Sequence, residues 1–187
     1  MNKKRILITG VGGGIGVHLF AHVCHTTDWD VVGIDSFRHK GIYDRLVEIC
    51  KDHPEWRERL TIFAHDLTVP LSEVLIKKIG RIDYVINMAS LSDVQASIDD
   101  PVPFIRNNVD LGLNMLEYAR VAKPDVYIQI STDEVYGPTE TKEDKGVKEW
   151  SPIYSISSVA NKFAGHLRLW KWTSCHNSVR QKPLRVE

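Results

Sequence analysis

The chain has 187 residues, 43% of them hydrophobic and 26% charged, which is the composition of one ordinary globular domain and leaves no room for two large ones. Its 24 basic and 24 acidic residues cancel, so the net charge gives no electrostatic case for binding a nucleic acid. No apolar run approaches the roughly 20 residues that a membrane span requires, so we expect no membrane partner.

Short apolar runs alternate along the chain with segments of helical periodicity. The runs are continuously apolar, as strands buried on both faces of a sheet should be, and they cover residues 5–9, 30–34, 60–64, 82–87 and 126–130. Helices are predicted over residues 15–24, 42–50, 70–79, 103–121 and 154–169. This alternation predicts parallel βαβ units. We therefore expect an α/β fold with a doubly wound, Rossmann-like parallel sheet and ligand sites at the carboxyl ends of its strands.

A glycine-rich loop follows the first predicted strand. Its pattern, G-x-x-G-x-x-G, places Gly10 where the chain turns, Gly13 where backbone approaches a pyrophosphate, and Gly16 where a helix packs on a strand. The helix that begins here offers free N–H groups and a positive dipole end to phosphates. Asp35 follows the second strand, where a carboxylate accepts hydrogen bonds from an adenosine ribose and repels a 2′-phosphate, so NAD is favoured over NADP. The alternative is a structural turn with a capping aspartate.

Later segments resemble the extended short-chain dehydrogenase/reductases. Asp66-Leu67 follows the third strand, where this family places an aspartate near the adenine, and Met88-Ala89-Ser90 follows the fourth, where the family has small residues beside the cofactor. The segment around Asn108 resembles the family's helix with an N-x-x-G element. The NAD-binding residues that the loop and the resemblance imply are Gly10, Gly13, Gly14, Ile15, Gly16, Asp35, Asp66, Leu67, Met88, Ala89, Ser90, Asn108 and Ser131.

The segment Ser131-Thr132-Asp133-Glu134-Val135-Tyr136-Gly137, after the fifth strand, resembles the signature of the dTDP-glucose 4,6-dehydratases. Such an enzyme oxidises C4 of the sugar by hydride transfer to NAD, eliminates water across C5–C6 and returns the hydride to C6. The elimination needs a base for the C5 proton and an acid for the C6 hydroxyl. The resemblance implies that Glu134 is the base, Asp133 the acid and Thr132 the hydrogen-bonding partner of the C4 oxygen. The alternative is a strand-end turn whose side chains cap the backbone.

The family's remaining catalytic element is Y-x-x-x-K on one helical face. The resemblance implies that its lysine lowers the pKa of the tyrosine and holds the nicotinamide ribose. Tyr154 matches the tyrosine, but Ser158 stands at the lysine position. Lys162 follows eight residues after Tyr154, which at about 1.5 Å per residue is roughly 12 Å along the helix axis. Tyr154 is therefore a candidate catalytic residue without its usual activator, and the alternative is a tyrosine packed at the start of a helix.

The end of the chain departs most from the family. The resemblance covers residues 4–165 and gives an NAD-binding domain over residues 1–168 and an atypical tail over residues 169–187. Family members continue with two more strands and a domain that grips the nucleotide-sugar, so we expect a chain lacking most of that substrate domain. Residues 169–177 can be encoded so that a one-nucleotide shift gives Tyr-Gly-Ser-Gly-Leu-Pro-Val-Ile-Ile, and a frameshift would account for the tail.

Three functions remain open. The Thr132-Asp133-Glu134 triplet favours an NAD-dependent nucleotide-sugar 4,6-dehydratase for the lineage. Epimerases and decarboxylases of UDP-sugars belong to the same superfamily. A non-catalytic NAD-binding remnant is the third, and Ser158 and the missing substrate domain favour it for this polypeptide.

The cysteines, the histidines and the family resemblance bear on the cellular compartment, on metal binding and on the oligomeric state. The three cysteines are scattered and form no CxxC pair, which argues against a disulfide framework or a zinc site and indicates a reducing cytoplasm. The eight histidines form no metal-ligand pattern with nearby acids, so we expect no metal. The resemblance also implies a homodimer formed through the helices over residues 100–121 and 154–169, which an altered second helix would weaken.

Overall fold

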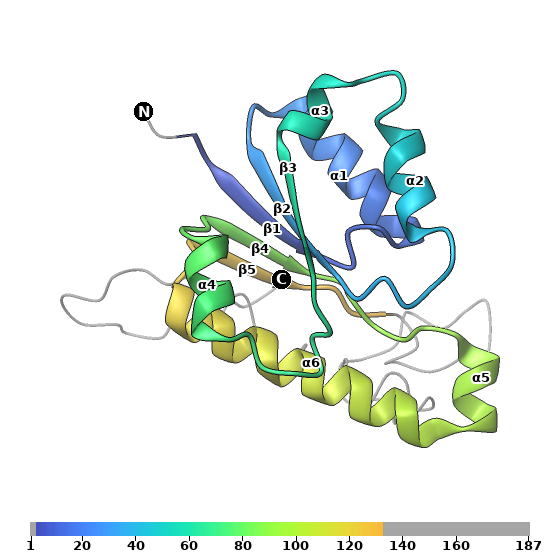
Figure 1. Ribbon diagram of the computed structural model, residues 1–187. Coiled ribbons are helices and arrows are strands. Elements are labelled where there is room, and N and C mark those ends of the chain that lie inside the picture. The colour runs from blue at the N-terminus through green and yellow to red at the C-terminus, as the bar shows by residue number, and fades with distance from the viewer. Residues whose placement is uncertain (1–2, 133–187) are drawn as a thin grey trace, which may run out of the picture.

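The structure is a computed structural model that describes residues 3–132 (Figure 1). Its strands are β1 (Arg5–Thr9), β2 (Asp30–Asp35), β3 (Leu60–Ala64), β4 (Tyr84–Asn87) and β5 (Val126–Gln129). Its helices are α1 (Gly14–Thr26), α2 (Ile42–Ile49), α3 (Glu55–Glu58), α4 (Glu73–Ile79), α5 (Val94–Asp99) and α6 (Pro101–Ala122). The strands form one parallel sheet of order β3-β2-β1-β4-β5. The predicted fold class is confirmed, and the strand order reverses between β1 and β4.

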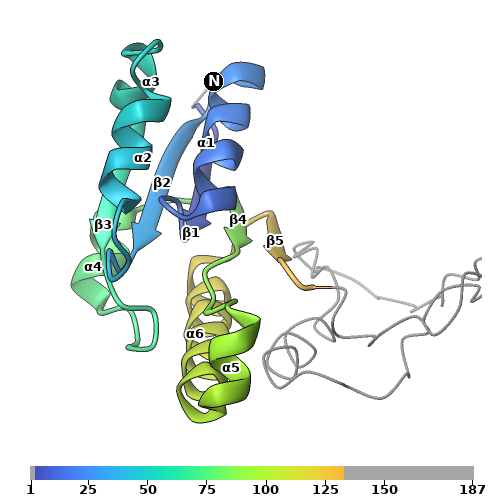
Figure 2. The same cartoon turned by 90° about the vertical axis from the view of Figure 1, so that its right-hand side faces the viewer.

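Two helical layers cover the sheet. Figures 1 and 2 show α1, α2 and α3 on one face, and α4, α5 and α6 toward the other. Alternate residues of β1 point into opposite layers: Ile6 and Ile8 join the core with α1 and α2, while Leu7 joins the core with α4 and α6. All three are nearly or fully buried. Both faces of the strand therefore need apolar side chains, which is why the run is continuous rather than alternating.

Several predicted boundaries were wrong. The helix predicted over residues 70–79 begins at Glu73, because Ser72 caps it by accepting the N–H of Leu75. The strand predicted over residues 82–87 begins at Tyr84, and the helix predicted over residues 103–121 begins at Pro101, a favoured first position for proline. The short helices α3 and α5 were missed. The predicted helix over residues 154–169, the domain boundary at 168 and the tail over residues 169–187 lie outside the described residues.

Charged side chains join the amino ends of the strands. Asp83, only 3% exposed, accepts hydrogen bonds from the backbone N–H of Arg5 at 2.9 Å, from Lys4 at 3.3 Å and from Arg81 at 2.6 Å. Lys4 also reaches Asp125 at 3.0 Å. Burial disfavours the charged Asp83 carboxylate, but the hydrogen bonds from Arg5 and Lys4 outweigh burial and hold its pKa below the ordinary value. These contacts fix the starts of β1, β4 and β5.

Candidate functional site

The glycine loop joins β1 to α1 at the carboxyl edge of the sheet. Gly10 has φ +66°, a left-handed conformation that side chains rarely adopt. A Cβ at Gly16 would overlap the carbonyl oxygens of Gly10 and Val11, so only glycine lets α1 pack this closely. The first turn of α1 has no acidic residue and its N-cap Gly13 offers no side chain. The N–H groups at the start of this helix can therefore serve an anionic ligand.

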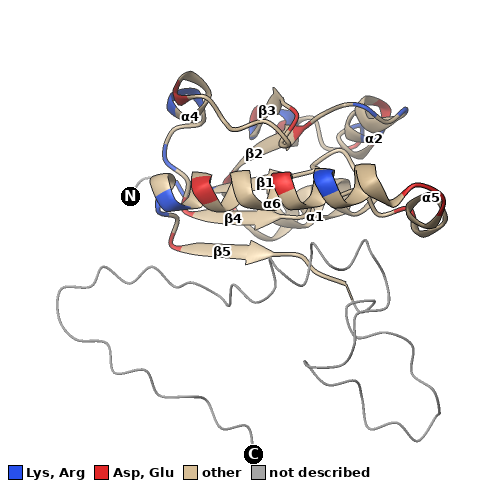
Figure 3. Cartoon of the chain, turned by 90° about the horizontal axis from the view of Figure 1, so that it is seen from below, with Lys and Arg blue, Asp and Glu red and all other residues tan. Residues whose placement is uncertain are grey.

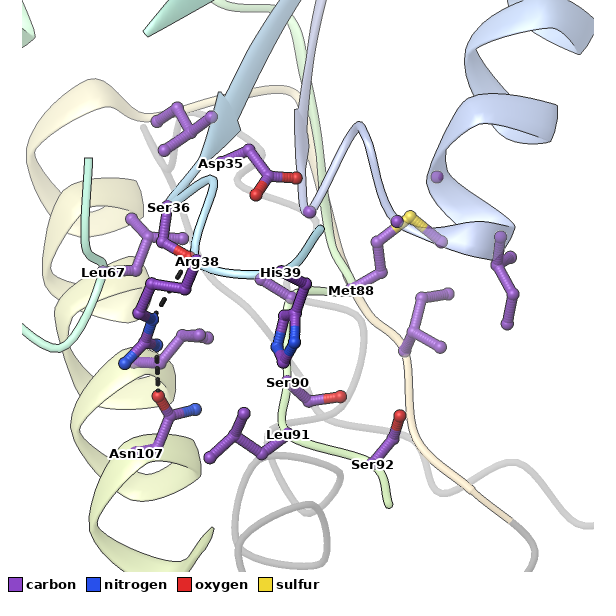
Figure 4. A pocket seen from close by; sticks show the side chains of 18 of the residues that line it. Asp35, Ser36, Arg38, His39, Leu67, Met88, Ser90, Leu91, Ser92 and Asn107 are labelled. Carbon is purple, nitrogen blue, oxygen red and sulfur yellow. Dashed lines mark hydrogen bonds between the residues drawn. The ribbon is translucent and has the colours of Figure 1, made fainter. Parts of the chain in front are cut away.

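Asp35 ends β2 and lies against the glycine loop (Figure 4). Its side chain is buried, with 7% exposed. One carboxylate oxygen accepts the N–H of Gly12 at 3.0 Å and the other accepts that of Phe37 at 3.1 Å. The carboxylate thus fixes the loop to β2 and still lines the open cleft. Each oxygen retains a second lone pair, so acceptance of ribose hydroxyls stays compatible with this geometry.

A cleft of about 700 Å³ opens where the carboxyl ends of the strands meet. Its walls come from the glycine loop and from the segments that follow β2, β3, β4 and β5. The predicted cofactor residues that line it are Gly10, Gly13, Gly14, Ile15, Gly16, Asp35, Asp66, Leu67, Met88, Ala89, Ser90 and Ser131. Thr132, the predicted partner of the C4 oxygen, lines it too. Segments far apart in sequence thus converge on one cavity.

Asn108 is the predicted cofactor residue that the structure does not place on the cleft wall. Its side chain is buried at 6% exposure. Its carbonyl oxygen accepts the N–H of Leu91 at 2.9 Å, and its amide donates to the carbonyl of Leu91 at 3.0 Å. Asn108 therefore holds the segment after β4 in place, and Leu91 rather than Asn108 lines the cleft.

A neutral hydrogen-bond network aligns β1, β4 and β5 beneath the cleft. The hydroxyl of Thr9, fully buried, donates to the side-chain oxygen of Asn87 at 2.6 Å and accepts the N–H groups of Met88 and Ala89 at 3.0 Å each. The amide of Asn87 donates to Gln129 at 2.8 Å. The network positions the segment after β4 against the glycine loop and connects it to β5, which leads into Ser131 and Thr132.

The residue that sequence reasoning missed most clearly is Arg38. Its guanidinium donates to Asn107 at 2.8 Å and to Ser36 at 3.3 Å, and lies 3.6 Å from the carboxylate of Asp66 (Figure 4). Ser36, Arg38, His39 and Asn107 all line the cleft. The available signal was the basic run Arg38-His39-Lys40, only three residues after Asp35.

Asp66 is held as a carboxylate. Its oxygen accepts the backbone N–H of Thr68 at 3.0 Å and the Thr68 hydroxyl at 2.8 Å. The backbone hydrogen bond from Thr68 is the main cause of a pKa below the ordinary value, and the charge of Arg38 adds to it. A charged Asp66 at the cleft rim can accept hydrogen bonds from an amino group.

The remaining catalytic candidates Asp133, Glu134 and Tyr154, together with Ser158, lie outside the described residues. Between residues 3 and 132, no group of three or more His, Cys, Asp or Glu side chains could hold a metal ion. In the same range, no helix is both long and apolar enough to cross a membrane. Figure 3 shows acidic and basic side chains interspersed along α6 rather than gathered by sign.

Comparisons with known proteins agree with this geometry. The family model described as "NAD dependent epimerase/dehydratase family" matches residues 6–179. A dTDP-glucose 4,6-dehydratase of Neisseria gonorrhoeae is 32% identical over 187 residues, covering 91% of this chain and 51% of that protein.

Solved structures show the same fold. DesIV, a dTDP-glucose 4,6-dehydratase from Streptomyces venezuelae solved with NAD bound, superposes with a TM-score of 0.69 at 25% identity and covers 86% of this chain and 49% of that one. A UDP-N-acetylglucosamine 4-epimerase from Methanobrevibacter ruminantium M1 gives 0.69 at 26% identity and covers 88% and 49%. The chain thus spans about half the length of these relatives.

Proposed function

Because the chain belongs to the NAD dependent epimerase/dehydratase family, we propose that its cleft binds NAD and that its lineage is that of a nucleotide-sugar 4,6-dehydratase of the dTDP-glucose type. One observation carries the proposal: a single cleft runs from the glycine loop and Asp35 to Ser131 and to Thr132, the first residue of the Thr-Asp-Glu triplet. Relatives named dTDP-glucose 4,6-dehydratase support the specific activity.

The residues present fit the cofactor. The start of α1 would take the pyrophosphate, because its N–H groups carry no side-chain cap. Asp35 and Ser36 would hold the adenosine ribose at the end of β2, and Asp66-Leu67 would border the adenine. When bound, NAD would supply an acceptor and later a donor of hydride.

The substrate side of the cleft belongs to β5. Thr132 would donate a hydrogen bond to the C4 oxygen of the sugar. Tyr154 would take the C4 hydroxyl proton as C4 is oxidised. Glu134 would then remove the C5 proton, and Asp133 would protonate the C6 hydroxyl, which leaves as water. Ser158 offers no ammonium to lower the pKa of Tyr154, so turnover by this polypeptide would be slow or absent.

A second candidate is a UDP-sugar epimerase or decarboxylase, favoured by the equal superposition of the UDP-N-acetylglucosamine 4-epimerase. A non-catalytic NAD-binding remnant is the third, supported by Ser158. Nucleotide-sugar substrate, homodimer and cytoplasmic location remain predictions for the whole protein. Incubation with NAD and either dTDP-glucose or UDP-sugars separates the three candidates. A 4-keto-6-deoxy sugar supports the dehydratase, an epimerised or decarboxylated UDP-sugar supports the second candidate, and NAD binding without product from either substrate supports the remnant.

Cofactor binding is tested first, by calorimetry on the full chain. A Cβ at Gly14 would meet no atom within 4 Å among the described residues, yet Gly14 lines the cleft. A Gly14→Asp variant places a carboxylate at the favourable end of the helix dipole, so the protein should stay folded. The same charge repels a pyrophosphate, and we expect NAD affinity to fall by on the order of 100-fold. Gly14→Ala is the matched control, and equal affinity in all three proteins would refute binding at this loop.

A further inference from the structure

The cleft has a compact subsite on the side of β2 and β3, where Arg38 crosses from the loop after β2 to α6 (Figure 4). The guanidinium is anchored by Asn107 at 2.8 Å and lies 3.6 Å from Asp66. Leu67 follows Asp66 directly, and Leu111 lies one helical turn after Asn107 on the same face of α6. A planar cation thus stands beside two apolar side chains that line the same cleft.

The floor of this subsite is apolar and its rim is polar. Leu67, Leu111 and Ile34 belong to one buried cluster, with exposures of 3%, 6% and 0%. The amide of Asn114 donates to the carbonyl of Leu67 at 2.9 Å and so fixes that floor to α6. The rim is formed by Asp66, which accepts hydrogen bonds. Apolar surface below and acceptors at the edge suit a flat heteroaromatic base that carries an amino group.

The strand order decides which part of a dinucleotide reaches this subsite. Ser36 and Asp66 follow β2 and β3, on one side of β1, whereas Thr132 follows β5 on the other side. The pyrophosphate seat at α1 lies between them, after β1. A dinucleotide across the cleft therefore places its adenosine toward Arg38 and its nicotinamide toward Thr132.

The present partners of Arg38 are exchangeable. Its side chain is 48% exposed and that of Asp66 is 41% exposed, and an ion pair between such exposed groups contributes little. The hydrogen bond to Asn107 is made to a neutral amide. A base that enters the subsite can therefore stack on the face of the guanidinium without breaking a strong interaction.

We propose that Arg38 is a binding residue of the cofactor site, whose planar guanidinium stacks on the adenine and closes the subsite over Leu67 and Leu111. The inference rests on the proposed function, since it assumes that the cleft binds NAD. It adds a contact outside the glycine loop and the acids, and it assigns the holding of the base to a residue of the β2–α2 loop.

The test is calorimetry with the full chain and four ligands: NAD, NADP, ADP-ribose, which carries the adenosine half of NAD, and nicotinamide mononucleotide, which carries the other half. We expect Arg38→Ala to weaken NAD and ADP-ribose by about tenfold and to leave nicotinamide mononucleotide unchanged. Arg38→Lys keeps the charge but not the plane, so it should recover less than half of the loss on a logarithmic scale. Arg106→Ala, an exposed arginine of α6, is the matched control and should bind as the parent does.

Several outcomes would overturn the role of Arg38 alone. These are unchanged NAD affinity in Arg38→Ala, full recovery in Arg38→Lys, which would indicate charge without stacking, and a larger loss for NADP than for NAD, which would indicate a 2′-phosphate contact. A parent chain that binds neither NAD nor ADP-ribose would instead refute the proposed function, and this inference with it. Thermal unfolding of each variant confirms that a loss of binding does not reflect a loss of folding.

Discussion

The two edges of the sheet are built from different kinds of interaction. At the amino edge, full charges pair with one another: Lys4 with Asp83 and Asp125, and Lys3 with Asp30 at 2.7 Å. At the carboxyl edge, the strands are joined by the neutral hydroxyl and amides of Thr9, Asn87 and Gln129. At the amino edge, the charged side chains therefore form ion pairs with one another. At the carboxyl edge, the first turn of α1 has no acidic residue and its N-cap Gly13 makes no side-chain hydrogen bond, so the N–H groups of this turn can serve an anionic ligand.

Removing the Thr9 hydroxyl tests the carboxyl edge and should have the largest effect. In Thr9→Val, the side-chain oxygen of Asn87 loses its donor, and the N–H groups of Met88 and Ala89 lose their acceptor in a fully buried place. We expect the free energy of unfolding to fall by about 3 kcal/mol and NAD affinity to fall as well, because Ala89 lines the cleft. Chemical denaturation and calorimetry measure the two effects.

Thr9→Ser is the control for that variant, since it keeps the hydroxyl and should lose about 1 kcal/mol or less. Equal stability of Thr9→Val and the parent would show that the network does not hold the edge together.

Removing the Asp83 carboxylate tests the amino edge. In Asp83→Ala, Lys4, Arg81 and the N–H of Arg5 lose a buried acceptor. The two basic side chains are 40% and 69% exposed, so water solvates them and the loss should be about 2 kcal/mol rather than that of a fully buried pair. NAD affinity of the folded protein should stay unchanged. Asp125→Ala, at a position 60% exposed, should change little, and a drop in NAD affinity in Asp83→Ala would show that the two edges are coupled.

The pH dependence of stability also tests the charged groups of the amino edge. Because the pKa of Asp83 is below its ordinary value in the folded state, its stabilisation is present above the unfolded pKa of about 3.9 and is lost as the pH falls toward the folded-state pKa. The parent should therefore lose stability below about pH 5 more steeply than Asp83→Asn does. The difference in the free energy of unfolding that acid produces between the two proteins should be smaller than the loss in Asp83→Ala at neutral pH. Parallel pH profiles of the two proteins would contradict it.

The smallest effect concerns a buried hydroxyl of α6. The Tyr118 hydroxyl, in a residue 2% exposed, finds no hydrogen-bond partner among the described residues, and burial raises its pKa. Tyr118→Phe should therefore leave stability unchanged or raise it by up to about 1 kcal/mol. Tyr127 is the control, since its hydroxyl donates to Gln129 at 3.1 Å. Tyr127→Phe should lose about 1 kcal/mol, and a greater loss in Tyr118→Phe would reveal a partner.

The sequence predicts the fold wherever the pattern is local. Apolar runs identify the five strands of the sheet to within two residues. Burial on both faces accounts for the runs of the inner strands β1 and β2, whereas β3, at the edge of the sheet, has three exposed residues. The start of α4 was missed because a serine cap, not periodicity, decides it. The helices α3 and α5 have four and six residues, too short for a periodic signal.

In the site too, the features set by a local pattern were predicted, and those set by residues far apart in sequence were missed. The glycine spacing predicts the loop, and the conformation of Gly10 and the crowding at Gly16 confirm the roles assigned to them. The bridge from Arg38 to Asn107 joins residues 69 apart in sequence, so no local pattern encodes it. Asn108 was assigned to the cofactor by resemblance, yet its side chain makes hydrogen bonds with Leu91 and Asn107. Partners across the sheet can be found only once the strands are in place.

The strand order also has a consequence during synthesis. One edge of β1 pairs with β2, which follows within a few tens of residues, but the other pairs with β4, where Ile6 lies opposite Tyr84. At about 5–20 residues per second, a ribosome needs several seconds to supply that partner. During this interval Ile6, Leu7 and Ile8 present an open strand edge to other nascent chains. Recovery of soluble protein should therefore depend on translation speed and chaperone supply.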